Sequence, residues 1–239
     1  PMRNLTAVLC LTLAMVLGST HVSMSASFQK GYDAYQKGNY VIAVREWELL
    51  AKQGDARAQN NLGFMYESGR GIPQNDETAM KWYNHSAKQG NAFAQYNLGV
   101  TYDEGKRVLQ NYKTAVKWYR LAAKQEHAGA QNNLGVMYQN GVGTGTPPDN
   151  KTAMKWYRLA AKQGNAPAHN NLGAMYTYGY GVAKDYVRAH MWFNIAASLG
   201  DKDEAPKNRD EVEKYMTSAQ IAKAQNVAIK CIRKNYKGC

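Results

Sequence analysis

Apolar and small residues recur at helical spacing through most of this 239-residue chain. Between residues 58 and 87 they form two stripes, each with the three- and four-residue spacing of one α-helical face. The stripes consist of Ala58, Leu62, Met65 and Tyr66, and of Ala79, Trp82, Tyr83 and Ala87. Gly69, Gly71 and Pro73 interrupt the helical pattern between the two stripes. The pattern predicts two antiparallel helices, and Gly63, on the first face, permits a neighbouring helix to approach closely.

This helix pair is repeated along the chain. Leu62, Leu98, Leu134 and Leu172 are separated by 36, 36 and 38 residues, and the two extra residues fall in the loop GVGTGTPPDN. An incomplete earlier copy runs over residues 28–54. A single pair cannot bury its apolar stripes alone, so neighbouring pairs must stack into one continuous core. We therefore predict an all-α solenoid.

The joints between copies follow one rule with one exception. A glycine at positions 54, 90, 164 and 200 is followed each time by Asp or Asn. Glycine adopts the left-handed conformation that ends one helix, and Asp or Asn caps the next helix. At the third joint Glu126 and His127 stand in these places. A left-handed Glu126 costs on the order of 1 kcal/mol, so we predict that this joint is irregular or the least stable.

The repeated strings resemble a known family. AQNNLGFMYESGRG from Ala58 and its three later copies, each followed by a pattern close to A-x-K-W-Y-x-x-A-A-x-x-G, are similar to the Sel-one-like repeat, a branch of the tetratricopeptide-type solenoids. The resemblance covers residues 28–201, and the segment from Asn208 is similar to the end of many such proteins. It implies a right-handed α-solenoid that serves as a protein-binding scaffold, in the cell envelope or at the bacterium–host interface.

The resemblance also implies which residues face the binding groove of the solenoid. By their position on the first helix of each pair they are Asn60, Phe64, Tyr96, Val100, Asn132, Val136, Asn170 and Ala174. The expected partner is a protein or peptide whose identity the sequence does not specify.

The N-terminal residues have the pattern of an export signal. Arg3 precedes an uncharged, mostly apolar run over residues 5–17, and small residues follow up to Ala26. The run is shorter than the roughly 20 apolar residues that cross a bilayer. We predict a cleaved signal peptide, no membrane span after cleavage, and a periplasmic or secreted protein. A lone N-terminal anchor is the alternative.

These patterns divide the chain into consecutive segments. They are a signal peptide at 1–26, an incomplete repeat at 27–55, full repeats at 56–91, 92–127, 128–165 and 166–201, and capping helices at 202–239.

A net charge of +12 favours anionic partners. Export argues against nucleic acid, since the polyanions outside the cytoplasm are envelope polymers and lipid headgroups. A basic stripe opposite the apolar face consists of Lys81, Lys88, Lys117, Lys124, Lys155 and Lys162. Binding of an anionic envelope polymer or lipid through this stripe is a second hypothesis, and a solvated face that keeps the array soluble is the alternative.

Catalytic patterns are weak. The histidines at 85, 127, 169 and 190 occupy unrelated repeat positions without metal-ligand spacing, and the glycine-rich loop lacks a following Gly-Lys-Ser/Thr. The chain is therefore predicted to be neither an enzyme nor a cofactor- or metal-binding protein, with an envelope hydrolase as the weakest alternative. The tryptophan found once per repeat, beside Tyr83, Tyr119, Tyr157 or Phe193, fits core packing better than a ligand platform.

Cys231 and Cys239 are the cysteines that remain after signal cleavage. An oxidising compartment favours a disulfide between them, which would tether the C-terminus. Two free thiols or a redox pair are the alternatives.

Overall fold

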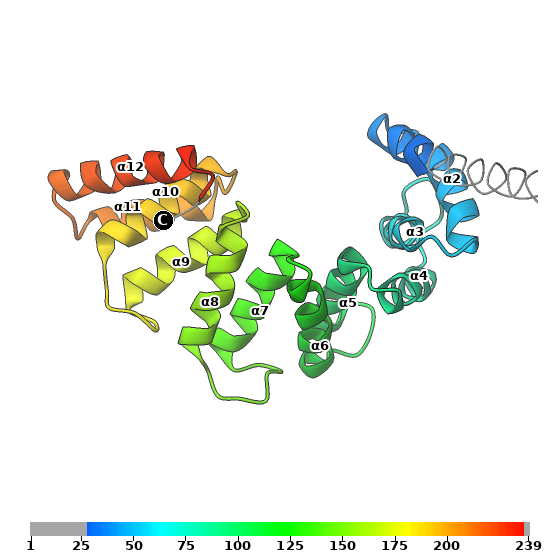
Figure 1. Ribbon diagram of the computed structural model, residues 1–239, viewed down its shortest axis with the longest axis horizontal. Coiled ribbons are helices and arrows are strands. Elements are labelled where there is room, and N and C mark those ends of the chain that lie inside the picture. Colours follow the sequence, from blue (N-terminus) through cyan, green and yellow to red (C-terminus); the bar gives the residue numbers. More distant parts are fainter. Residues whose placement is uncertain (1–27, 237–239) are drawn as a thin grey trace, which may run out of the picture. The chain divides into compact units, whose positions relative to one another are not determined.

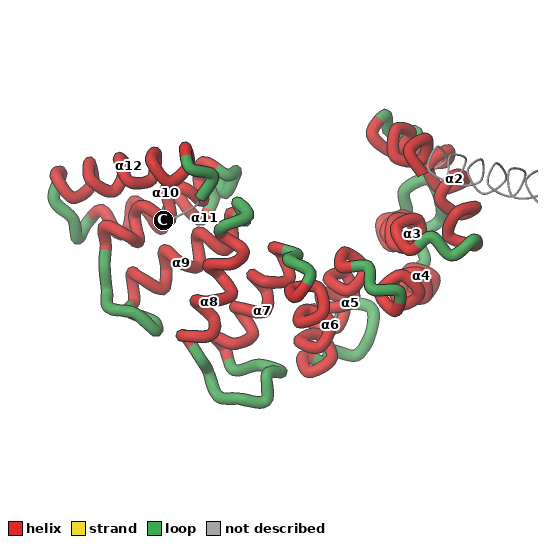
Figure 2. The backbone as a smooth tube through the Cα atoms, viewed as in Figure 1, coloured by secondary structure: helices red, strands yellow, loops and turns green. Residues whose placement is uncertain are grey.

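The computed structural model describes residues 28–236, and the regular elements in that range are helices (Figures 1 and 2). The predicted signal peptide and Cys239 lie outside the described residues. A helical segment over residues 28–36 comes first. The helices that follow are α2 Tyr40–Lys52, α3 Ala56–Ser68, α4 Asp76–Lys88, α5 Ala92–Glu104, α6 Tyr112–Lys124, α7 Ala128–Asn140, α8 Asn150–Ala161, α9 Ala166–Tyr178, α10 Tyr186–Ser198, α11 Glu204–Glu213 and α12 Ser218–Arg233.

The chain divides into two compact units, residues 1–94 and residues 95–239. In the first unit α3 packs against both α2 and α4, and the buried side chains include Trp47, Leu50, Leu62 and Met65. In the second unit each of the helices α6 to α10 packs against the next one. Helices α11 and α12 both pack on α10, so α12 covers the last repeat. The predicted all-α repeat array is confirmed.

A glycine on the first helix of each pair lies beneath an aromatic ring of the second helix. A Cβ atom at Gly63 would be 2.8 Å from the ring of Tyr83, and one at Gly135 would be 2.6 Å from the ring of Tyr157. Gly99 with Tyr119 and Gly173 with Phe193 repeat the contact at 2.5 Å. The predicted close approach at Gly63 is confirmed, because no larger residue fits under the ring without a shift.

The large side chains of the core are the residues beside the tryptophans. Tyr83, Tyr119, Tyr157 and Phe193 are fully buried, and Trp47 is 2% exposed. Trp192 is also buried, whereas Trp82, Trp118 and Trp156 are half-buried. The tryptophans therefore lie at the edge of the core in the middle repeats, and the tyrosine hydroxyls bond outward to Glu67, Asp103 and Gln139.

The joint at Glu126 keeps the geometry of its neighbours. Glu126 has φ of +62°, in the left-handed region, and its N–H donates to the Ala123 carbonyl as the glycine N–H donates at the other joints. His127 caps α7 by accepting the Ala130 N–H at Nδ1. The prediction of an irregular joint is wrong. The His127 cap on α7 and the hydrogen bond from the Glu126 N–H to the Ala123 carbonyl hold Glu126 in the left-handed conformation. The low stability of the joint stays a prediction.

Glutamine side chains connect consecutive helices at the joints, a feature that the sequence analysis missed. Gln131 donates to the Ala123 carbonyl of α6 and accepts from Gln163 at the end of α8. Gln59 makes the same two contacts with the Ala51 carbonyl and Gln89 in the first unit. A buried amide with both ends paired fixes the distance between three helices.

The C-terminal cap begins at Asp201, whose carboxylate accepts the N–H groups of Glu204 and Ala205. Asn208 lies inside α11 and therefore does not cap it. Thr217 and Gln220 form the capping box that their spacing predicts at the start of α12.

Candidate protein-binding surface

A hollow of about 270 Å³ lies in the first unit, on the side formed by the first helix of each helix pair. The helical segment 28–36, α3 and the first turn of α5 surround it. Its lining consists of Phe28, Tyr32, Arg57, Asn60, Asn61, Asn91 and Phe93. Phe93 is 63% exposed and Tyr32 is 44% exposed, so apolar surface faces solvent here.

Local contacts hold the polar walls of this hollow. Asp55 caps α3 and binds the Arg57 guanidinium at 3.0 Å, and that guanidinium lies 4.4 Å from the centre of the Phe28 ring. Burial raises the pKa of the Asp55 carboxyl, but the bonds from Arg57 and from backbone N–H groups outweigh it and leave the pKa lowered. Asp55 therefore stays ionised and holds Arg57 over the aromatic ring.

Asparagine side chains form the other wall. The Asn60 amide donates to the Asn61 side-chain oxygen at 3.2 Å, and Asn91 caps α5 by accepting the Ala94 N–H. Phe93 is on the first turn of α5, so the Asn91 cap holds the backbone that carries its ring. Together the residues offer amide groups next to an exposed aromatic ring, which suits an extended peptide segment with an apolar side chain.

Asn60 is the predicted groove residue that lines this hollow. Phe64 is half-buried and packs on the core of the first unit, where Arg70 lies 5.5 Å from the centre of its ring. Val100 and Val136 are half-buried against the cores of the second unit, and Ala174 is half-buried on α9. The Tyr96 ring stacks on His127 with centroids 4.5 Å apart. Burial first, then nearby carboxylates, raise the pKa of Tyr96.

Two predicted groove residues, Asn132 and Asn170, are buried. Asn171 donates to the Asn132 side-chain oxygen at 3.0 Å, and Asn208 of the cap donates to that of Asn170 at 3.0 Å. Asn132 in turn donates to Asn133. The expectation that Asn132 and Asn170 are open contact residues is wrong, because both amides are taken up by bonds between successive first helices.

This amide row continues into a partly buried chain of hydrogen bonds. Asn133 donates to the Tyr119 hydroxyl at 3.0 Å, and that hydroxyl donates to Asp103 at 3.1 Å. Burial raises the pKa of both Tyr119 and Asp103. The row therefore links α9, α7, α6 and α5 and stabilises the second unit rather than offering contacts to a partner.

Tyr32, Arg57, Asn91 and Phe93 also line the hollow, but none of them was predicted as a groove residue from the sequence. Phe93 occupies a repeat position where the other copies have Arg57, Gly129 and Pro167. A core position keeps its residue type from copy to copy, whereas this position does not. An aromatic residue at such a variable position was therefore the available sign of a surface contact residue.

The six lysines of the predicted basic stripe are all exposed. Lys81 binds Glu77 at 2.7 Å, and across residues 28–236 no ion pair engages the other five. Lys117 lies 5.9 Å from the centre of the Trp118 ring.

Among the described residues, no group of three or more His, Cys, Asp or Glu side chains is arranged to hold a metal ion. His190 is fully buried between Asn194 and Glu213, and its Nε2 lies 2.7 Å from the Glu213 carboxylate. Burial lowers the pKa of His127 and of His169. The buried histidines pack within and between helices, as structural residues do.

Cys231 is buried and takes part in a disulfide. Its pairing with Cys239 stays a prediction. In the described part of the chain, none of the helices has both the length and the apolar character needed to cross a membrane.

Comparison with known proteins places these features in a family. The Sel1 repeat family matches residues 56–91, 92–127, 128–165 and 166–201. Comparison with curated proteins gives no significant match.

Solved structures give the same result. A Sel1 repeat protein from Oxalobacter formigenes has a TM-score of 0.73 at 33% identity, with 85% of this chain and 82% of that chain covered. The protective antigen c5321 of uropathogenic Escherichia coli, which displays an SLR fold, has a TM-score of 0.59 at 29% identity over 89% of this chain and 55% of its own. The immunity protein Pa5087 of Pseudomonas aeruginosa shares the fold at 16% identity, with a TM-score of 0.52 over 86% and 82%. The chain belongs to the Sel1 repeat family, whose members are typically non-enzymatic scaffolds that mediate protein–protein interactions.

Proposed function

We propose that this protein is an exported scaffold that binds a partner protein through the hollow of its first unit. The observation that carries the proposal is the exposed Phe93 ring beside the amides of Asn60 and Asn61 on one wall of that hollow. A phenylalanine ring that is 63% exposed on a concave, amide-lined surface has the chemistry of a contact site.

The expected ligand is an extended segment of a partner protein. An apolar side chain of that segment would contact Phe93 and Tyr32, and the asparagine amides would bond to its main chain. The frame around the hollow is already held by the Asp55 and Asn91 caps, so binding orders little of the scaffold.

The proposed setting is the bacterial cell envelope or the host interface, in the periplasm or outside the cell. The export pattern of residues 1–26 supports it. One similar structure is that of a protective antigen of a pathogenic bacterium, a description that is consistent with a surface-accessible protein.

Affinity capture tests the proposal, with the full chain as bait in extracts of the source organism. Phe93→Ser removes the exposed ring, and Leu109→Ser removes a side chain that is 92% exposed elsewhere. We expect one set of partners to survive 0.5 M salt, to be lost with Phe93→Ser and to be kept with Leu109→Ser.

The opposite result has an equally clear meaning. Capture that disappears in 0.5 M salt and is insensitive to Phe93→Ser would reject the hollow and favour the lysine stripe. Attraction between exposed charges weakens with salt, because the Debye length falls from about 10 Å at 0.1 M to about 3 Å at 1 M.

A further inference from the structure

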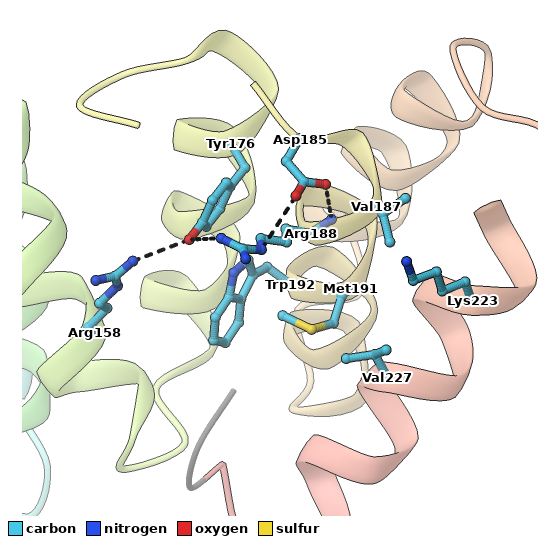
Figure 3. A pocket seen from close by; sticks show the side chains of 9 residues that line it. All are labelled: Arg158, Tyr176, Asp185, Val187, Arg188, Met191, Trp192, Lys223 and Val227. Atoms are coloured by element: carbon cyan, nitrogen blue, oxygen red, sulfur yellow. Dashed lines mark hydrogen bonds and ion pairs between the residues drawn. The ribbon is translucent and has the colours of Figure 1, made fainter. Parts of the chain in front are cut away.

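A larger hollow, of about 690 Å³, lies in the second unit between α8, α9, α10 and α12 (Figure 3). Arg158 comes from α8, Tyr176 from α9, and Lys223 from α12. None of its lining residues belongs to the groove or the basic stripe predicted from the sequence.

Two arginines meet at one buried phenol oxygen in this hollow. The guanidinium groups of Arg158 and Arg188 donate to the Tyr176 hydroxyl at 3.2 and 3.4 Å, and approach it from two sides (Figure 3). Tyr176 is 5% exposed. A phenol oxygen has two lone pairs and one proton, so both lone pairs are used and the proton is left to donate. Residues 28–236 supply no acceptor for it.

The charges around the hollow are not balanced. Arg158, Arg188 and Lys223 face a single carboxylate, that of Asp185. Asp185 already caps α10 and lies 3.4 Å from the Arg188 Nε atom. Within the described range no carboxylate pairs with Arg158 or Lys223. Two positive charges are therefore available to a ligand.

A buried donor next to the hollow is also unsatisfied. Trp192 is 7% exposed and lines the hollow, and its indole Nε1–H has no acceptor in the part of the chain that the structure describes. A buried N–H without a partner is costly and requires an explanation, and a ligand, ion or water bound in the hollow would supply the missing acceptor. The opposite wall is apolar and consists of Val187, Met191 and Val227.

We propose that this hollow binds an organic carboxylate that carries an apolar group. The carboxylate would accept from Arg158, Arg188 and the Tyr176 hydroxyl, since guanidinium groups match carboxylate geometry. The apolar group would lie on Val187, Met191 and Val227. The Asp185 carboxylate disfavours a dianion such as phosphate, because like charges repel at short range in a partly buried site. Both the end of a peptide chain and a small free acid have this chemistry.

The test uses N-acetyl-leucine as the probe and N-acetyl-leucinamide as its uncharged control. Binding is followed by the ¹⁵N-labelled indole N–H signal of Trp192 in the full chain, which Trp192→Phe assigns. We expect the acid to shift this signal saturably and the amide to bind at least about tenfold more weakly. Acetyl-Ala-Ala-Leu distinguishes the sources: tighter binding than the single residue indicates a peptide end, and equal binding indicates a small acid.

A matched arginine controls for folding. Arg120 on α6 donates to the Tyr138 hydroxyl at 2.8 Å, as Arg158 donates to that of Tyr176, but Arg120 lies outside the hollow. We expect Arg158→Gln to weaken binding at least about tenfold and Arg120→Gln to leave it unchanged. Lys223→Gln, on an exposed residue, should weaken binding about threefold without affecting the fold.

Three results would overturn the proposal. They are equal binding of acid and amide, equal losses with Arg158→Gln and Arg120→Gln, and binding of inorganic phosphate as tight as that of the acid. None of them bears on the hollow of the first unit, so the two proposals fail separately.

Discussion

The two units of this chain are built from the same repeat but differ in the surroundings of one asparagine position on the first helix. Both place a glycine under an aromatic ring and a paired glutamine at the joint. In the first unit Asn60 lines a hollow with an exposed phenylalanine, whereas the equivalent Asn132 of the second unit is 8% exposed and bonded to the next repeat. The repeated residues therefore build the frame, and their neighbours decide whether a surface is open for binding.

The glycine positions give the largest expected effect and test whether the frame is the same in both units. Gly63→Ala and Gly135→Ala each place a Cβ atom at 2.8 or 2.6 Å from a buried tyrosine ring. We expect each to lower the free energy of unfolding by about 2 kcal/mol, measured by urea denaturation. Stabilisation by either variant, as alanine gives in an ordinary helix, would show that the contact is loose in that unit.

Asn132 and Asn60 test whether the two units differ at this repeat position. Asn132→Ala leaves the half-buried Asn171 amide without its acceptor, so we expect a loss of about 1–2 kcal/mol of stability. Asn60→Ala removes a half-buried side chain beside an open hollow, where water can replace the hydrogen bonds of the amide. It should lower the free energy of unfolding by about 0.5 kcal/mol or less. Equal losses in urea titrations would remove the distinction between the two units.

The joints provide a test within the frame. Glu126 is left-handed at φ +62°, so Glu126→Gly should raise stability by about 1 kcal/mol. The converse change Gly90→Glu, at φ +90° with open space around the added Cβ, should lower it by a similar amount. Thermal unfolding that shows no change in either variant would mean that the left-handed position carries no strain.

The smallest expected effect is a pH dependence at His127. Burial lowers its pKa in the folded protein, and its Nδ1 must be unprotonated to accept the Ala130 N–H. The unfolded chain then binds the proton more tightly. The contribution of His127 to stability is therefore full above 6.5, the ordinary pKa of a histidine, and is lost as pH falls from there through the lower pKa of the folded state.

His127→Asn gives the matched control, since asparagine caps the equivalent helices after residues 90 and 164. We expect the loss of stability between pH 7.5 and pH 5 to be smaller in the variant by a fraction of 1 kcal/mol. An unchanged difference would exclude His127 as a contributor.

The helix pairs of the frame could be predicted from the sequence because their apolar residues and glycines recur at a fixed period, whereas the glutamine contacts at the joints were missed. Leu62, Gly63 and Tyr83 recur in every copy or are replaced by a close equivalent, and periodic apolar positions identify helix faces directly. The Thr217–Gln220 capping box was equally visible, since its signal is local.

The binding surfaces were less predictable. Asn132 and Asn60 occupy the same position in the repeat, so periodicity alone could not tell the buried amide from the one beside the hollow. The difference depends on contacts made by residues 38 or 39 positions away, as in Asn171 to Asn132 and Asn208 to Asn170. Likewise, the hollow around Tyr176 joins residues as distant as Arg158 and Val227, which no local pattern connects.

Site-specific photo-crosslinking in cells of the source organism tests directly whether the hollow of the first unit binds a partner protein. A benzophenone amino acid replaces Phe93 in the hollow or, in a separate variant, Tyr178, an aromatic residue that is 59% exposed in the second unit. We expect a partner protein to crosslink at position 93 and not at position 178. Crosslinking at position 178 alone would contradict this expectation and move the binding surface to the second unit.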